Sequence, residues 1–148
     1  MSTPIEQVVY VAEATADFGR EGGVRITDAE PSTFSLVKPP GMGGRSGADG
    51  VNPEQLFAAG YAACFHGALL FNARQEGVAA DGSTVTARVS IGRVADGGFG
   101  LAVELEIHLP GVPHDQAEAL VEIAHGACPY SRATRGNIDV VLRTRTDH

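Results

Sequence analysis

One stretch of the chain decides its fold: residues 52–71, which read NPEQLFAAGYAACFHGALLF. Asn52 is a favourable helix cap, Pro53 is favoured at the first helical position, and the carboxylate of Glu54 would lie beside the positive end of the helix dipole. These signals predict that a helix starts here. It should continue to about Glu76, because a glycine follows that residue.

The middle of this predicted helix is apolar on every side apart from His66. A surface helix would show a polar stripe, so we expect a core helix that is covered on more than one side. Small residues also recur at every fourth position, which lets another backbone approach closely. They are Gly60, Cys64 and Ala68, and Ala59, Ala63 and Gly67. A domain of this size covers one face with its own sheet, and a second copy of the chain most simply covers the other. The sequence therefore predicts a homodimer.

The residues before the helix predict three short strands and a loop. The strands are expected at residues 5–12, 23–28 and 33–37, where β-branched residues lie between Gly, Asp and Pro. Residues 38–50 are so rich in Gly and Pro that neither helix nor strand is expected. A connection of this length favours a binding or lid role.

The residues after the helix predict a β-hairpin, a helix and a last strand. Residues 84–91 and 101–108 alternate with period two, and Asp96-Gly97-Gly98 supplies the turn between them. An amphipathic helix is expected at 113–127 and a strand at 138–144. Strands and helices alternate irregularly, so the predicted class is α+β with a mostly antiparallel sheet.

Length and charge narrow the possible functions. The 148 residues fit a single domain that spans residues 1–148. The formal charge of −7 disfavours nucleic acid as a partner. The N-terminus resembles no secretory signal, and no run of about 18 uninterrupted apolar residues indicates a membrane span. We expect a cytoplasmic protein.

The two cysteines, Cys64 and Cys128, are too few for a disulfide-stapled scaffold. Each is either a buried residue that packs as a small apolar side chain or a reactive thiol. Pro129 predicts that Cys128 caps a short helix over residues 129–134, where the helix dipole would lower the pKa of its thiol. Apolar surroundings would instead raise the pKa of Cys64 unless a cation reaches it, and Arg20 is one candidate.

A metal site is an alternative for the same residues. Cys64-x-His66 and His125-x-x-Cys128 supply a Cys2His2 set. However, residues i and i+2 of a helix point about 200° apart, so Cys64 and His66 cannot converge on one ion. We therefore expect no metal, and we interpret both histidines as structural hydrogen-bonding residues.

Two long motifs carry a resemblance to a known family. Residues 52–65, together with residues 124–140, which read AHGACPYSRATRGNIDV, closely resemble the organic hydroperoxide resistance proteins of the OsmC/Ohr family. The resemblance implies an OsmC-like fold, with sheets around a long central apolar helix in an intertwined homodimer. It also implies a thiol peroxidase that reduces organic hydroperoxides to alcohols without metal or flavin.

The resemblance assigns roles to four residues. It implies that Cys64 is the peroxidatic cysteine, that Cys128 is the resolving cysteine, and that Arg20 and Glu54 are the active-site Arg and Glu. A disulfide between the cysteines would then be reduced by dihydrolipoyl groups of lipoylated proteins.

The spacing of Glu54 and Cys64 adds a geometric hypothesis. Ten residues of unbroken helix separate the two by about 15 Å of rise, so they cannot share a site within one subunit. We expect that Glu54, and with it Arg20, acts on the Cys64 of a second subunit. A helix break near Gly60 is the alternative.

Other functions stay open at this point. A relative of the OsmC type could use a different reductant or substrate. A hydrophobic-ligand binding module, in which the apolar helix and the Gly-rich loop enclose a fatty acid, would leave the cysteines without a role. A structural Cys2His2 metal protein is the third alternative.

Overall fold

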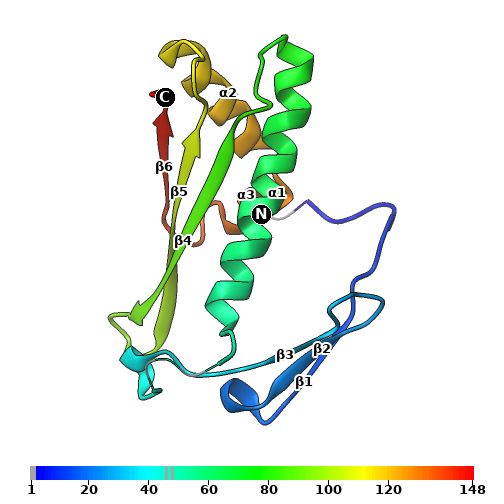
Figure 1. Cartoon of the computed structure of the whole chain (residues 1–148), viewed down its shortest axis with the longest axis vertical. Helices are drawn as coiled ribbons and strands as arrows, with labels where there is room; N and C mark the ends of the chain where they lie inside the picture. The colour runs from blue at the N-terminus through cyan, green and yellow to red at the C-terminus, as the bar shows by residue number, and fades with distance from the viewer. Residues whose placement is uncertain (1–2, 46, 48) are drawn as a thin grey trace. The chain divides into compact units, whose positions relative to one another are not determined.

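The computed structural model describes residues 3–45, 47 and 49–148 (Figure 1). Of the predicted Gly- and Pro-rich loop, Ser46 and Ala48 lie outside the described residues, as do Met1 and Ser2 at the N-terminus. The chain forms two compact units, residues 1–53 and 54–148, and each is described by itself.

The first unit is built on a three-stranded antiparallel sheet. Its order is β1-β2-β3, formed by β1 (Ala14–Asp17), β2 (Gly23–Ile26) and β3 (Thr33–Ser35). The 3-10 helix η1 (Gly19–Glu21) joins β1 to β2, and the Asp17 carboxylate accepts a hydrogen bond from the Gly23 backbone at 3.1 Å. A second 3-10 turn, η2 (Pro40–Met42), lies in the Gly- and Pro-rich loop. The strands predicted at 23–28 and 33–37 are confirmed, somewhat shorter than expected.

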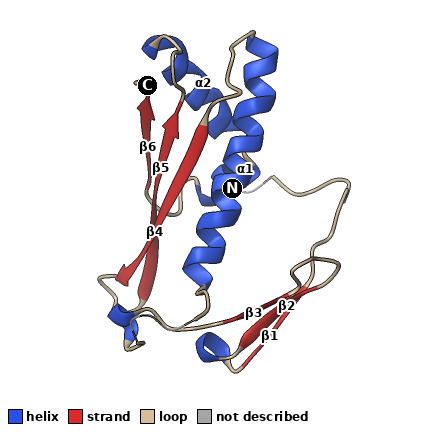
Figure 2. Ribbon diagram, in the orientation of Figure 1, coloured by secondary structure: helices blue, strands red, loops and turns tan. Residues whose placement is uncertain are grey.

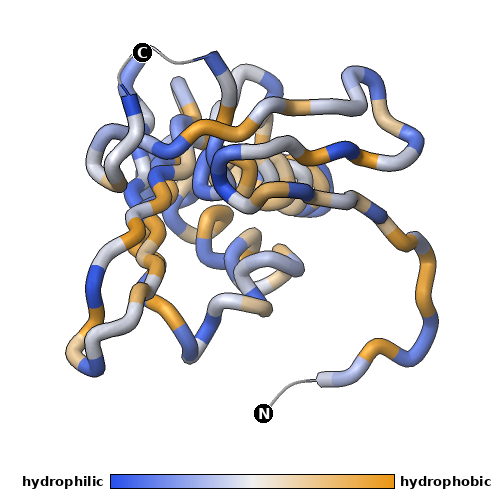
Figure 3. Tube along the Cα trace, turned by 90° about the horizontal axis from the view of Figure 1, so that it is seen from below, coloured by the Kyte–Doolittle hydropathy of each residue, from blue (hydrophilic) through white to orange (hydrophobic). Residues whose placement is uncertain are grey.

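The strand predicted at residues 5–12 is wrong. In the part of the chain that the structure describes, these residues form no strand, and β1 begins only at Ala14. The segment is nevertheless exposed along its length, and it is rich in apolar residues (Figure 3). Its exposed large apolar residues are Ile5, Val8, Val9, Tyr10 and Val11. Strand propensity produces a strand only where a partner strand is available, and within the first unit β1 takes the position next to β2.

The second unit is a sheet covered by helices (Figure 2). The strand order is β4-β5-β6, formed by β4 (Thr84–Arg93), β5 (Phe99–His108) and β6 (Val140–Arg145). The hairpin β4-β5 is antiparallel, while β6 runs parallel to β5 because the helices between them return the chain to the same end of the sheet. The helices are α1 (Pro53–Glu76), α2 (His114–Ala127) and α3 (Pro129–Thr134). These elements confirm the predicted α+β class and the mostly antiparallel pairing.

One face of α1 enters the core of the second unit. Tyr61, Phe65, Leu69 and Ala73 follow one another at four-residue intervals and are buried. They pack in one cluster with the inward residues of β5 and α2, which are Val103, Leu105, Ile107, Ala117, Leu120, Val121 and Ala124. Full burial of one large apolar side chain stabilises a fold by about 1.5–3 kcal/mol, so this cluster fixes α1 against the sheet.

Another face of α1 carries small and apolar residues that lack a cover within the second unit. Ala59, Ala63, Gly67 and Phe71 are exposed, and we call these four residues the α1 stripe. Phe71 keeps 56% of its surface accessible. By length and composition alone, α1 is the one helix of the described chain that could cross a membrane, although the core helix of a soluble protein passes the same test. The expectation that α1 is covered on more than one side therefore requires something besides its own unit.

Candidate active site

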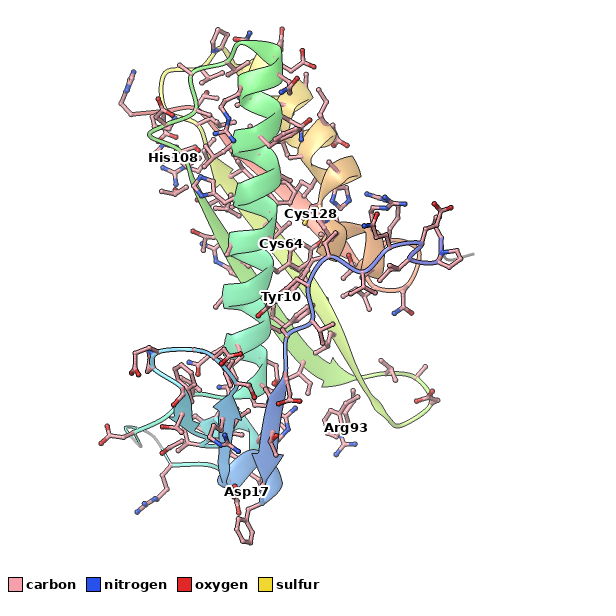
Figure 4. All side chains as sticks on the ribbon, turned by 90° about the vertical axis from the view of Figure 1, so that its right-hand side faces the viewer. Tyr10, Asp17, Cys64, Arg93, His108 and Cys128 are labelled. Atoms are coloured by element: carbon pink, nitrogen blue, oxygen red, sulfur yellow. The ribbon has the colours of Figure 1, made fainter. Side chains whose placement is uncertain are left out.

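The two cysteines lie side by side at the junction of α1 and α3 (Figure 4). Cys64 is half-buried on α1, and Cys128 is fully buried at the start of α3. Their sulfur atoms are 3.5 Å apart, and the thiol of Cys128 donates to the sulfur of Cys64. Both thiols are free. A disulfide needs a sulfur–sulfur distance of about 2.05 Å, so a small approach of the two sulfurs would join them.

The position of Cys128 follows from the proline after it. Pro129 disfavours helical geometry at the residue before it, and Cys128 has φ −63° and ψ 123°, which is extended. Its backbone N–H closes the last turn of α2 on Ala124, and its carbonyl accepts the first hydrogen bond of α3 from Arg132. The prediction that Cys128 caps a helix over residues 129–134 is confirmed.

The surroundings of Cys64 oppose its ionisation. Burial raises the pKa of the Cys64 thiol, and the neighbouring Cys128 raises this pKa further. A hydrogen bond from the backbone of Tyr130, in the first turn of α3, acts in the opposite direction. The sequence predicted that the start of α3 would favour a thiolate at Cys128. In the structure, the backbone of Tyr130 at the start of α3 forms a hydrogen bond with the sulfur of Cys64.

Arg20 and Glu54 belong to different units. Arg20 lies on η1 in the first unit and is half-buried, while Glu54 is the second residue of α1. The helix α1 runs without interruption from Pro53 to Glu76, so a break near Gly60 is ruled out. Glu54 and Cys64 are thus ten residues apart on one continuous helix, or about 15 Å along its axis.

Three aromatic rings pack beside the cysteines. The rings of Phe57, Tyr61 and Tyr130 have centroids 5.8–6.3 Å apart. Gly60 permits this packing, because a Cβ atom at this position would lie 3.3 Å from the Tyr130 ring. Phe57 and Tyr61 lie two turns and one turn before Cys64 on α1, and Tyr130 follows Cys128 by two residues, so these rings form an apolar wall near the sulfur pair.

The sequence did not predict the polar group next to Cys128. The hydroxyls of Tyr61, Ser131 and Thr134 and the ring of His125 are joined by hydrogen bonds of 2.8–3.1 Å. The available signal was that His125 and Ser131 each lie three residues from Cys128, and that Tyr61 lies three residues from Cys64. This signal does not predict the group, because its side chains come from three helices and meet only after these helices are assembled.

The other candidate groups lie apart from the cysteines. His66 Nε2 hydrogen-bonds to Ser83 Oγ at 3.0 Å, which ties α1 to the turn before β4. Within residues 3–45, 47 and 49–148, no three His, Cys, Asp or Glu side chains are grouped to hold a metal ion. A hollow of about 420 Å³ lies over the sheet of the first unit, but neither cysteine lines it.

Comparison with known proteins finds relatives of one family. The family model described as OsmC-like protein matches residues 45–143. The organic hydroperoxide resistance protein of Xanthomonas axonopodis pv. citri is 48% identical over 143 residues, which cover 96% of this chain and 98% of that protein. The organic hydroperoxide resistance protein OhrA of Bacillus subtilis is 45% identical over 139 residues, or 93% of this chain and 97% of that protein.

Solved structures agree with these sequence relatives. The crystal structure of an organic hydroperoxide resistance protein from Elizabethkingia anophelis matches with a TM-score of 0.88 and 44% identity, over 97% of this chain and 100% of that chain. The structure of the organic hydroperoxide resistance protein OhrB of Bacillus subtilis matches with a TM-score of 0.85 and 41% identity, over 93% of this chain and 100% of that chain.

Proposed function

Because the chain belongs to the OsmC-like protein family and, within it, to the organic hydroperoxide resistance proteins, we propose that it is a thiol peroxidase. It reduces organic hydroperoxides, including those of fatty acids, to alcohols in the cytoplasm and so defends against oxidative stress. The distance of 3.5 Å between the sulfurs of Cys64 and Cys128 carries the proposal, because it brings two free thiols within reach of a disulfide.

The first step oxidises Cys64. Its thiolate attacks one oxygen of the hydroperoxide, the O–O bond breaks, and the alkoxide leaves and takes up a proton as the alcohol. Cys64 becomes a sulfenic acid. The apolar wall of Phe57, Tyr61 and Tyr130 beside the sulfur favours bulky organic hydroperoxides over hydrogen peroxide.

The second step joins the two cysteines. The sulfur of Cys128 attacks the sulfenic sulfur of Cys64, a disulfide forms, and the hydroxyl leaves as water. This step protects Cys64 from irreversible oxidation. An external dithiol, a dihydrolipoyl group of a lipoylated protein, then reduces the disulfide and becomes a cyclic disulfide itself. The cycle uses the two cysteines and this reductant, without metal or flavin.

Arg20 and Glu54 complete the proposed site. The guanidinium of Arg20 stabilises the Cys64 thiolate, which burial alone disfavours, and donates hydrogen bonds to the peroxide. The carboxylate of Glu54 pairs with Arg20 and fixes its orientation. These roles rest on the family resemblance and on the need of Cys64 for a cation.

A homodimer would cover the exposed apolar residues of one chain and would bring Glu54 to a Cys64 that it can reach. The exposed α1 stripe and the exposed apolar residues of segment 5–11 both favour a second copy as their cover. Because α1 is continuous, Glu54 cannot reach the Cys64 of its own helix along that helix. In the dimer, Glu54 and Arg20 of one subunit would act on Cys64 of the other.

The peroxidase is tested by turnover of tert-butyl hydroperoxide with dihydrolipoamide as the reductant. We compare the wild type with Cys64→Ser and Cys128→Ser. Rapid turnover in the wild type and its loss in both variants is expected, and Cys128→Ser should still reduce one equivalent of peroxide through Cys64. A wild type that does not consume the peroxide contradicts the proposal.

The shared site is tested by mixing two inactive variants. Subunits of Cys64→Ser and Glu54→Gln are unfolded together, refolded and assayed. If Glu54 acts across the dimer, a mixed dimer contains one intact site and activity returns. If Glu54 acts within its own subunit, mixing restores no activity.

A further inference from the structure

A chain of hydrogen bonds joins the three helices around the cysteine pair. It runs from His125 Nδ1 to Ser131 Oγ at 2.8 Å, from Ser131 Oγ to Tyr61 Oη at 2.8 Å, and from Tyr61 Oη to Thr134 Oγ1 at 3.1 Å. Thr134 Oγ1 then donates to the backbone carbonyl of Ser131 at 3.2 Å. We call these four residues the hydroxyl chain. Tyr61, Ser131 and Thr134 are buried, so water does not compete for these bonds.

The direction of each bond in the hydroxyl chain is fixed from its carbonyl end. Thr134 has one hydroxyl proton and donates it to a carbonyl, so it accepts a hydrogen bond from Tyr61. Tyr61 in turn accepts from Ser131, and Ser131 accepts from His125. The ring of His125 must therefore carry a proton on Nδ1. Burial and the nearby Arg135 lower the pKa of His125, which favours the neutral ring, and the bond to Ser131 then requires the single proton on this nitrogen.

The hydroxyl chain connects the segments on both sides of Cys128 to the helix of Cys64. His125 lies three residues before Cys128 near the end of α2, and Ser131 lies three residues after it in α3. Tyr61 lies one turn before Cys64 on α1. Arg135 also donates to the carbonyl of His125 at 2.6 Å, which holds the end of α2 to the end of α3. A shift of α3 away from α1 would break the bonds of Tyr61 to Ser131 and to Thr134.

We propose that His125, Ser131, Tyr61 and Thr134 are positioning residues that hold Cys128 against Cys64 and so control the fate of the Cys64 sulfenic acid. This inference rests on the proposed function. With the chain intact, the sulfenic acid and the Cys128 thiol condense to a disulfide and water. When the sulfurs are held less well, a second hydroperoxide oxidises the sulfenic acid to sulfinic acid and is itself reduced to the alcohol.

The experiment measures how oxidised Cys64 partitions between disulfide and sulfinic acid. Reduced protein is treated with excess tert-butyl hydroperoxide, and the two products are quantified by intact mass. Tyr61→Phe removes one hydroxyl and keeps the ring, while Thr134→Val removes the hydroxyl at the last residue of the hydroxyl chain. Since each lost hydrogen bond changes an equilibrium by about two- to tenfold, the ratio of sulfinic acid to disulfide should rise by about that factor in both variants. In Thr134→Val, the rate at which the first equivalent of peroxide is consumed should not change.

Conservative variants separate positioning from general stability. Thr134→Ser retains the hydroxyl, so it should partition as the wild type does. His125→Asn places an amide N–H near the position of Nδ1, whereas His125→Gln places it near Nε2. Only the Asn variant should therefore retain wild-type partitioning. Unchanged partitioning in Tyr61→Phe and Thr134→Val, or equal behaviour of the Asn and Gln variants, would overturn the inference.

A second measurement does not depend on peroxidase activity. The ratio of dithiol to disulfide at Cys64 and Cys128 is determined in mixtures of reduced and oxidised dithiothreitol. Tyr61→Phe should shift this ratio toward the dithiol by about two- to tenfold, and Thr134→Ser should not shift it. If the wild type consumes no hydroperoxide but Tyr61→Phe shows this shift, the proposed function is contradicted and the positioning role is kept. The absence of the shift would contradict the positioning role alone.

Discussion

Cys64 combines a reactive position with surroundings that oppose its charge. Burial and the adjacent Cys128 raise the pKa of its thiol, and the backbone hydrogen bond from Tyr130 only partly offsets them. A nucleophilic cysteine needs its thiolate, because the neutral thiol attacks peroxides poorly. At the scale of single residues, the proposed chemistry therefore depends on a positive charge, and Arg20 is our candidate for it.

Removal of the Arg20 charge should shift the ionisation of Cys64 to higher pH. An opposite charge within about 4–6 Å lowers the pKa of an acid by about 1–3 units, so Arg20→Gln should raise the midpoint by at least about 1 unit. We would measure the alkylation rate of Cys64 by iodoacetamide against pH, in a Cys128→Ser background. The rate at neutral pH should fall about tenfold.

Arg25→Gln is the matched control for this measurement. Arg25 is exposed on β2 in the same unit, and its substitution removes the same charge from the whole chain. We expect no shift of the Cys64 midpoint in this control. Equal shifts in the two variants would mean that the overall charge of the chain matters and that Arg20 has no specific role.

At the scale of elements, the sequence predicted those helices, strands and turns whose formation depends on neighbouring residues in the chain. The β4-β5 hairpin, α2 and the extended Cys128 between α2 and α3 were each predictable from alternation, helical spacing or Pro129. The strand expected at 5–12 failed because pairing needs a partner strand that no local pattern reports. The hydroxyl chain was missed for a similar reason, since its residues meet only when α1, α2 and α3 pack together.

The solvent face of the β4-β5-β6 sheet carries a network of ion pairs. Glu104 pairs with Arg88 and Arg143, while Glu106 pairs with Arg88 and Arg145. Hydrogen bonds from these arginines lower the pKa of both carboxyls below the ordinary value of 4.5. Because the folded protein lowers these pKa values, the pairs stabilise the fold at any pH above the carboxyl pKa of the unfolded chain. This stabilisation is lost as the pH falls through the carboxyl pKa of the folded protein.

Neutral carboxamides at these two positions should make the fold less sensitive to acid. The double variant Glu104→Gln, Glu106→Gln should have a slightly lower Tm than the wild type at about pH 7, because exposed ion pairs contribute little. Between about pH 6 and about pH 3 its Tm should fall less than that of the wild type. Thermal unfolding followed by circular dichroism measures both quantities. Salt at about 1 M should reduce the difference, and a steeper acid loss in the variant would contradict the argument.

For the whole molecule, the central question is what covers α1. Its buried face holds the core of the second unit, while the α1 stripe of Ala59, Ala63, Gly67 and Phe71 remains exposed. Small residues at four-residue intervals suit the close approach of another helix, which agrees with the homodimer that we propose. The same helix carries Glu54 and Cys64, so the assembly and the proposed site depend on one element.

A charge placed in the α1 stripe should therefore separate the subunits without unfolding them. Ala63→Glu faces away from the core of its own unit, so far-ultraviolet circular dichroism should match that of the wild type. Burial of an unpaired carboxylate between two helices is strongly unfavourable, so the variant should sediment as a monomer at concentrations where the wild type is a dimer. Ala119→Glu, the same change at an exposed position of α2, is the control and should remain dimeric.

If Glu54 acts across the interface, the monomeric Ala63→Glu variant should also lose peroxidase turnover although Cys64 and Cys128 are intact. A dimeric Ala63→Glu protein would show that the stripe is not the interface, and an active monomer would show that each chain holds a complete site.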